Sequence, residues 1–252
     1  MMGIRLYVCG RLAIAGNLIV DEAALPGRQV RLALAMLAVE RRHPVSVDQL
    51  TWALWGDDVP AGASASVASV VSKVRRALRR AGADGPEVIA GGVGTYHLRL
   101  PAGSTIDLES ARQSIDVADG ARRQGNHHKA WAEATVAVSI ARRGFLPGEA
   151  APWAYSIQQE LQRIEGRGYR ALTWAWSERG NGAMATAMAE RAVEVEPLHE
   201  PSWRALMRTR ARFASRADAV RAYRRCREVI GSELGVAPDA MTTRLYEELL
   251  TS

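Results

Sequence analysis

The chain has 252 residues, 48% of them hydrophobic and 24% charged, which is typical of a folded soluble protein of one large domain or two ordinary ones and excludes a disordered chain. Lysine and arginine number 33 against 27 acidic residues, and the resulting net charge of +6 weakly favours polyanions as partners. Cys9 and Cys226 are too few and too far apart in sequence to indicate a disulfide framework or a metal site, and no run approaches the roughly 18 apolar residues of a membrane span.

The first hundred residues mix strands and helices. Residues 4–20 are apolar and β-branched, with a break at Gly10 and a turn signal at 15–17, which predicts a small antiparallel sheet. Arg5 and Arg11 interrupt any signal-peptide core, so we expect the protein in the cytoplasm. Helices are predicted over 28–41 and 47–55, the second with Ser46 as its N-cap. Trp52 and Trp55 lie three residues apart on that helix and are expected in the core.

A strongly basic helix follows. The eleven residues from Val70 to Arg80 hold five basic side chains and no acidic one. Apolar residues recur within this helix at the spacing of a single helical face, namely Val67, Val71, Val74 and Leu78. From Glu87 the sequence EVIAGGVGTYHLRL predicts a hairpin, whose tip needs the positive-φ backbone that Gly91, Gly92 and Gly94 allow. A basic helix followed by a hairpin is what a winged helix presents to DNA.

After residues 101–104 the pattern is almost entirely helical. We expect helices near 107–124, 127–142, 153–179, 183–195, 199–213, 216–231 and 239–250. The junctions at Arg123, Glu178 and Ala211 resemble one another, as expected for a helical-repeat array. Trp174 and Trp176 lie two residues apart and cannot share one helical face, so we expect at least one of them to be partly exposed or at an interface. The fold class is therefore an α+β winged helix-turn-helix N-terminal domain followed by an all-α TPR-like helical-repeat domain.

No catalytic pattern emerges from the sequence. It has no phosphate-binding GxxxxGK[ST] loop, no HExxH and no serine in a nucleophile elbow. We expect that the protein is not an enzyme and that it holds no cofactor and no metal.

The segments GRQVRLALAMLAVERRHPVSVDQLTWALWGDD, VASVVSKVRRALRR and GGVGTYHLRL together resemble an OmpR-type winged helix-turn-helix. The segment from Ile106, especially RAYRRCREVIGSELGVAP, resembles a bacterial transcriptional activation domain. Together they resemble the short form of the Streptomyces antibiotic regulatory protein (SARP) family, with the DNA-binding domain over 1–102 and the activation domain over 106–252. One departure is Thr95, which separates Gly94 from Tyr96 where the family usually has a Gly-Tyr pair.

The resemblance implies a sequence-specific transcriptional regulator, an activator that binds promoter direct repeats in double-stranded DNA as a homodimer and recruits RNA polymerase holoenzyme. It places base-facing side chains at Ala68, Ser69 and Lys73 and phosphate-facing ones at Ser66, Ser72 and Arg75. On chemical grounds Lys73 is the best candidate to read guanine. Arg76 is expected to neutralise phosphate, and Thr95 to touch a phosphate or the minor-groove edge.

The resemblance also makes Asp57 and Asp58 candidates for contact with RNA polymerase, although they can equally cap and solvate a turn. A second hypothesis is a protein-interaction module of the same fold with weak or lost DNA binding. It rests on Ala65, Ala68 and Val70, which are small or apolar where base readout needs long polar groups. The sequence shows no polar cluster in the helical half to support a third possibility, a small effector.

Overall fold

The structure is a computed structural model that describes residues 3–83 and 88–251. The expected start of the hairpin at Glu87, and the outermost residues of the two expected domains, lie outside the described residues. Contacts within the chain define two compact units. The first unit comprises residues 1–110 with 143–159, and the second comprises 111–142 with 160–252. Each unit is described by itself.

A four-stranded sheet opens the first unit, in the order β3-β2-β1-β7. Strands β1 (Arg5–Tyr7), β2 (Ala13–Ala15) and β3 (Ile19–Val20) are antiparallel, as the sequence predicts. The short strand β7 (Thr105–Ile106) pairs with β1 in parallel. The buried side chains of this sheet face the core, and they are Leu6, Ile14, Val20 and Ile106.

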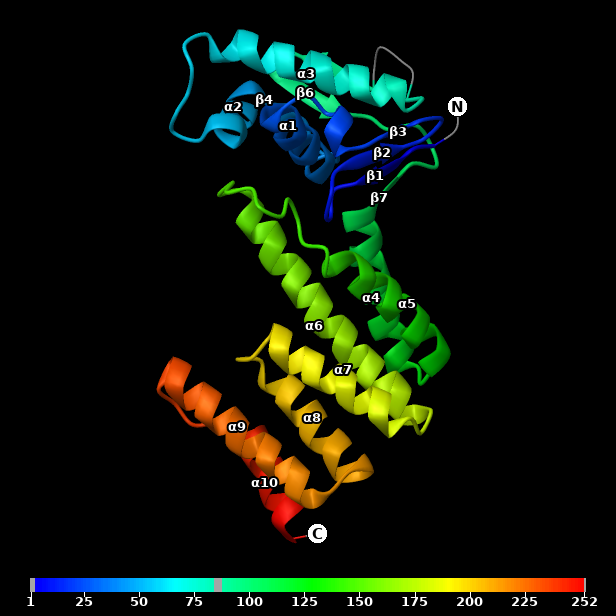
Figure 1. The fold of residues 1–252 in the computed structure, drawn as a ribbon, viewed down its shortest axis with the longest axis vertical. Coiled ribbons are helices and arrows are strands. Elements are labelled where there is room, and N and C mark those ends of the chain that lie inside the picture. The colour runs from blue at the N-terminus through cyan, green and yellow to red at the C-terminus, as the bar shows by residue number, and fades with distance from the viewer. Residues whose placement is uncertain (1–2, 84–87, 252) are drawn as a thin grey trace. The chain divides into compact units, whose positions relative to one another are not determined.

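Three α-helices come between β3 and β7 in sequence, α1 (Arg28–Val39), α2 (Val47–Trp55) and α3 (Ala63–Arg80), with a short 3-10 helix (Glu22–Ala24) before them. Figure 1 shows the three helices in blue to cyan. Ser46 caps α2 as predicted, because its hydroxyl accepts from Gln49 N–H at 3.0 Å and the Gln49 side chain accepts from Ser46 N–H at 2.8 Å.

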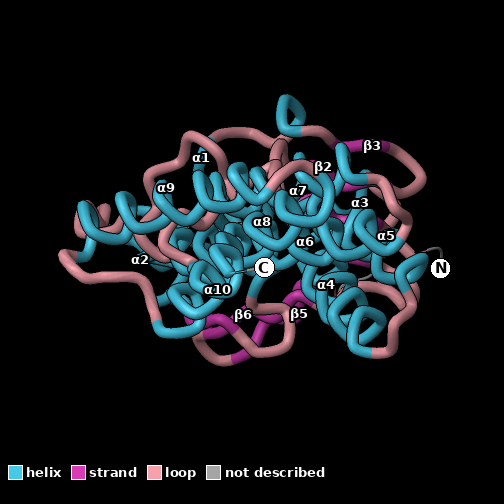
Figure 2. The backbone as a smooth tube through the Cα atoms, turned by 90° about the horizontal axis from the view of Figure 1, so that it is seen from below, coloured by secondary structure: helices cyan, strands magenta, loops and turns pink. Residues whose placement is uncertain are grey.

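A second sheet completes this part of the first unit, with the order β4-β6-β5. The predicted hairpin forms from β5 (Ile89–Gly92) and β6 (Thr95–Leu98), which appear in magenta in Figure 2. The third strand, β4 (Val45–Ser46), precedes α2 and pairs with β6 in antiparallel fashion. The hairpin is therefore joined to the start of α2 by backbone pairing.

Residues 143–159 belong to the first unit although they follow two helices of the second. Gly10 N–H donates to the Gly144 carbonyl at 2.8 Å, and the indole N–H of Trp153 donates to the Ala53 carbonyl at 3.3 Å. Glu149 pairs with Arg28 at 2.7 Å. The chain thus returns to the first unit through a segment that the sequence places in the helical half.

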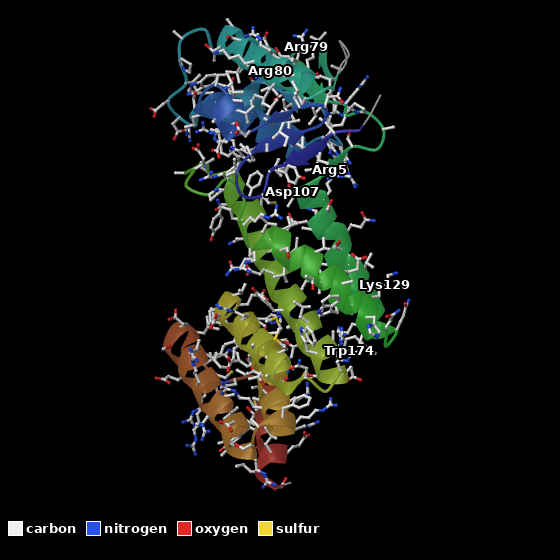
Figure 3. The ribbon with its side chains drawn as sticks, turned by 45° about the vertical axis from the view of Figure 1, so that its right-hand side comes forward. Arg5, Arg79, Arg80, Asp107, Lys129 and Trp174 are labelled. Atoms are coloured by element: carbon white, nitrogen blue, oxygen red, sulfur yellow. The ribbon has the colours of Figure 1, made fainter. Side chains whose placement is uncertain are left out.

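Asp107 is a buried carboxylate at the beginning of α4 (Asp107–Arg123), where Figure 3 labels it. Its oxygens accept from Val8 N–H at 2.8 Å, Cys9 N–H at 3.2 Å and Leu108 N–H at 2.9 Å. Burial raises the pKa of Asp107, and the three backbone donors oppose this shift. The carboxylate links the end of β1 to the first turn of α4.

The remaining helices form most of the second unit, and their bounds agree with the sequence to within a few residues. They are α5 (His127–Ala141), α6 (Ala154–Glu178), α7 (Gly182–Val195), α8 (Glu200–Phe213), α9 (Arg216–Leu234) and α10 (Ala240–Thr251). The predicted end of α9 at residue 231 is three residues short, because the helix passes through Gly231 and ends at Leu234, with Gly235 as its C-cap. In the residues described, no helix is both long and apolar enough to cross a membrane.

Two of the three similar junctions share their geometry. Asn126 and Asn181 are the N-caps of α5 and α7, with φ, ψ of −86°, 83° and −88°, 83°. Each side chain accepts from a backbone N–H three residues on, at 3.0 Å. The third junction differs, because Ser215 caps α9 from an extended conformation. The helical-repeat pattern is thus regular in its first two junctions and altered in the third, and the second unit is helical and TPR-like.

Candidate nucleic-acid interface

The apolar stripe of α3 is buried as predicted. Val67, Val71, Val74 and Leu78 have no exposed surface, and α3 contacts α1 and α2. Val70 is also buried, which corrects its expected place among the outward residues. At about 100° per residue, Val70 lies at the edge of the apolar stripe. The outward face therefore contains one apolar side chain fewer than the sequence suggested.

The outward face of α3 is polar and increasingly basic toward its C-terminal end. Ala68, Ser69, Ser72, Lys73 and Arg76 are exposed, whereas Ser66 is half-buried. Arg79 and Arg80 follow in the last turn and are also exposed, and Figure 3 labels both. In the described part of the chain, four cations of α3 have no carboxylate within ion-pair distance, namely Lys73, Arg76, Arg79 and Arg80.

Arg75 differs from its basic neighbours on α3. Its side chain is half-buried, and its guanidinium donates to the Ile89 carbonyl through Nε at 3.2 Å and Nη2 at 2.8 Å. The same group lies over the Tyr96 ring, 5.7 Å from its centroid. Arg75 therefore attaches α3 to both strands of the β5–β6 hairpin. The resemblance gave Arg75 only a phosphate-facing role, and the sequence held no signal of this attachment.

The hairpin tip consists of three glycines and one valine, so it exposes backbone and a single apolar side chain. Gly92 and Thr95 pair across the tip, and Val93 between them is fully exposed. Among the three glycines expected to need positive φ, only Gly94 has it, at 64°. A Cβ added at Gly92 would lie 2.7 Å from the Thr95 hydroxyl, so a larger residue there would displace the Thr95 side chain. Thr95 is half-buried and also pairs with Ser46.

Asp57 and Asp58 are exposed in the segment between α2 and α3. Asp58 N–H donates to the Trp55 carbonyl at 3.1 Å, which continues the end of α2 as a turn. Trp52 nearby is 48% exposed, so the expectation that it lies in the core is wrong. It lies about 200° around the helix from the buried Leu50, so a helical wheel of α2 would have placed it outward. An exposed tryptophan on the helix that precedes two exposed carboxylates is a feature that the sequence interpretation missed.

The structure thus brings some predicted site residues together and separates others. Lys73, Arg76 and their serine neighbours share the outward face of α3, and Arg75 holds this helix against the hairpin that carries Thr95. The two aspartates lie before the beginning of α3, in a different segment. The arrangement offers a basic helix, an adjacent hairpin tip and a separate acidic loop.

Comparisons with known proteins identify the family of the chain. The profile of the bacterial transcriptional activator domain matches residues 106–250. Transcriptional regulatory protein EmbR of Mycobacterium tuberculosis is 30% identical over 222 residues, which are 87% of this chain and 57% of EmbR. Transcriptional regulator RedD of Streptomyces coelicolor is 27% identical over 266 residues, covering 96% of this chain and 71% of RedD.

A solved structure shows the same likeness. Mycobacterium tuberculosis EmbR in complex with a low-affinity phosphopeptide superposes with a TM-score of 0.87 at 27% identity, covering 99% of this chain and 65% of that one. This chain therefore spans just over half the length of EmbR. The relatives are named transcriptional regulators. The chain belongs to the family that contains the bacterial transcriptional activator domain, and it is a member of the Streptomyces antibiotic regulatory protein family.

Proposed function

We propose that this chain is a sequence-specific DNA-binding transcriptional regulator, an activator that binds promoter direct repeats and recruits RNA polymerase. In this proposal residues 1–102 form an OmpR-type winged helix-turn-helix and residues 106–252 form the activation domain. The observation that carries it is the basic face of α3, which has no ion pair with a carboxylate of the described residues, beside the β5–β6 hairpin. The named function of the relatives supports it.

The outward face of α3 fits the requirements of a helix in the major groove. That groove admits one α-helix, whose outward side chains reach base edges. Ser69 and Ser72 lie near the middle of this face and Lys73 at its side, all exposed, so these residues and Ala68 are positioned to approach bases. Arg76 and the two arginines after it supply charge for phosphates, which adds affinity without sequence information.

The hairpin and the half-buried residues have supporting roles. Because Arg75 binds the Ile89 carbonyl, its main contribution is to hold the hairpin beside α3, and its remaining N–H groups can still meet a phosphate. Ser66, at the edge of the face, and Thr95, at the base of the tip, are placed to contact the backbone of DNA. The exposed Val93 makes the tip a narrow, uncharged projection.

Recruitment of RNA polymerase holoenzyme is assigned to Asp57 and Asp58. Both carboxylates are exposed and form no ion pair within the described residues, so they are open to a basic partner. The exposed Trp52 adds an aromatic surface of the kind that anchors protein interfaces. Binding to direct repeats implies two copies on DNA, and we expect a homodimer in that complex.

Fluorescence anisotropy with labelled duplexes tests the proposal. A fragment of a target promoter should bind at least tenfold more tightly than random duplex at physiological salt, since specific binding usually exceeds non-specific binding by about 10³ or more. Equal affinity for every fragment and for random duplex would contradict specific regulation. The slope of log affinity against log salt concentration then gives the number of phosphate contacts.

An alternative function is favoured by one observation, the small exposed side chains in the first turns of α3. Ala65 and Ala68 are exposed, and their methyl side chains have no group that could hydrogen-bond to a base. This composition suits a protein-interaction module of the same fold with weak or lost DNA binding. Co-purification of one stoichiometric protein partner, together with salt-insensitive or absent DNA binding, would support this alternative over the first function.

A further inference from the structure

The second unit contains a cavity of about 520 Å³ that the proposed function does not use. Its walls come from α4, α6 and α8. The lining residues recur at helical spacing on α6, at 167, 170, 171, 173, 174, 177 and 178, and on α8, at 201, 205, 208, 209 and 212. Each helix therefore presents one continuous face to the cavity. Figure 3 labels Trp174, which lies on the α6 face.

The charge of this lining is predominantly positive, with five arginines and two carboxylates. Two of the arginines already have partners in the protein. Arg167 donates to Asp119 at 2.7 Å and to Asp116 at 2.8 Å, and Arg170 donates to Glu196 at 2.6 Å. These ion pairs fix both half-buried guanidinium groups in place and neutralise most of their charge.

The other three arginines are exposed and are held weakly or not at all. Arg212 lies 3.7 Å from Glu178, too far for a good hydrogen bond. Arg122, on α4, and Arg208, on α8, have no ion pair or side-chain hydrogen bond anywhere in residues 3–83 and 88–251. Both line the cavity. Two guanidinium groups from different helices are therefore available to an anion.

Two hydroxyl groups and an indole complete the lining. Thr209 is 5% exposed and Ser177 is 9% exposed, and both line the cavity. Neither hydroxyl has a hydrogen-bond partner among the residues described. Every side-chain oxygen or nitrogen of those residues that is fully buried does have a partner, so these two hydroxyl oxygens are not fully buried. Both hydroxyls therefore open onto the cavity. Trp174 is half-buried there, and its ring offers a flat apolar surface.

We infer that this cavity, the effector cavity, binds a small organic dianion that carries a flat apolar group. Arg122 and Arg208 would donate to its phosphate or paired carboxylates, in the forked geometry that guanidinium groups favour. Ser177 and Thr209 would donate further hydrogen bonds, and Trp174 would pack against the flat group. The volume lies within the roughly 300–1,000 Å³ typical of small-molecule sites, and so favours a small ligand over a long acidic peptide.

Such a ligand would join α4, α6 and α8 by additional contacts. Binding to the folded state alone stabilises it, so occupation should raise the melting temperature of the second unit. The inference concerns binding by the helical unit and does not depend on DNA recognition. Failure of DNA binding and failure of this site are therefore distinguishable.

Isothermal titration calorimetry on the full chain tests the site, with phenyl phosphate, isophthalate, inorganic phosphate and a tetraglutamate peptide as probes. We expect one molecule of phenyl phosphate or isophthalate to bind per chain, and the preference between these two identifies the anionic group. The double variant Arg122→Ala with Arg208→Ala should bind the better probe at least about tenfold more weakly, because two charge-assisted donors are lost. Trp174→Leu should weaken binding of the aromatic probes and leave that of inorganic phosphate unchanged.

Two variants serve as matched controls. Arg224→Ala removes an exposed arginine of α9 that does not line the cavity, and it should leave binding unchanged. Arg76→Ala removes a cation of α3, which lies in the first unit, and should leave binding of the probes unchanged. Loss of probe binding in Arg76→Ala with retention in the double variant would overturn the proposal, as would absence of binding of every probe at millimolar concentration. Tighter binding of tetraglutamate than of either aromatic probe would overturn the assignment to a small ligand.

Discussion

Arg75 and Arg76 are adjacent arginines of α3, yet the structure predicts opposite consequences of replacing each by alanine. Arg75 donates two hydrogen bonds to Ile89, on the edge strand β5 of its sheet. Arg76 is exposed and has no ion pair among the described residues. Arg75→Ala should therefore loosen the hairpin, whereas Arg76→Ala should weaken DNA binding without loosening it.

The magnitude for Arg75 follows from these contacts. A hydrogen bond from a charged donor contributes about 1.5–3 kcal/mol, and a cation–π contact at an exposed site adds about 0.5–1 kcal/mol. Since the Arg75 side chain is half-buried, we take the net loss as about 2 kcal/mol. At about 1.4 kcal/mol per tenfold, this raises the opening equilibrium of the hairpin about thirtyfold. Arg76→Ala should change it little, as most exposed substitutions do.

Hydrogen exchange measured by mass spectrometry on peptides that cover β5 and β6 gives the readout. Exchange there should be about thirtyfold faster in Arg75→Ala and unchanged in Arg76→Ala. In parallel, the slope of log affinity against log salt for random duplex should flatten by about 0.9 in Arg76→Ala, the loss of one phosphate contact. Equal hairpin exchange in both variants, or an unaltered slope in Arg76→Ala, would refute this division of roles.

Three further substitutions test other parts of the structure. Lys73→Ala should cost about 1–3 kcal/mol at a cognate site but little on random duplex, and unchanged discrimination in competition assays would exclude base reading by Lys73. Replacing Asp57 and Asp58 by alanine should lower run-off transcription several-fold without weakening promoter binding in a gel shift, whereas full activity would exclude the polymerase contact. Asp239 accepts from Thr242 N–H at 2.7 Å at the beginning of α10, so Asp239→Asn keeps an N-cap but removes the charge opposite Arg204, which is only 8% exposed. Burial opposes the shift, but hydrogen bonds from Thr242 and Arg204 lower the pKa of Asp239 below its usual 3.8. A lowered folded-state pKa stabilises the fold above the unfolded value and loses that contribution as pH falls through the folded pKa. Because the Asp239 side chain is 45% exposed, Asp239→Asn should lower the free energy of unfolding by about 1 kcal/mol at pH 7. Urea titrations should show a progressively smaller loss below pH 3.8. An equal cost at pH 7 and at low pH would show that the charge contributes nothing.

Local rules were sufficient where local interactions decide the structure. The helices of the second unit were predictable because apolar periodicity and the capping residues Asn126 and Asn181 act within one turn. The N-cap at Ser46 and the buried stripe of α3 follow the same logic. The end of α9 was missed because Gly231 is tolerated inside a helix that its neighbours stabilise.

Features that depend on distant residues were not predictable. Strand β4 is two residues long and exists only because β6 pairs with it. Residues 143–159 join the first unit through contacts with residues 100 or more positions away in sequence, such as Trp153 with Ala53. In the sequence Arg75 cannot be distinguished from its basic neighbours, because its partner, the Ile89 carbonyl, is brought to it only by the folded hairpin. The effector cavity was invisible for the same reason, since its arginines belong to three separate helices.

The central claim, sequence-specific DNA binding through α3, is tested most directly by selection of bound fragments from sheared genomic DNA of the source organism. The purified chain should enrich a small set of promoter fragments that share a direct repeat. The Lys73→Ala chain should recover a broader set with a weaker shared motif. Recovery of fragments in proportion to their abundance, with no shared motif for the unsubstituted chain, would contradict the claim.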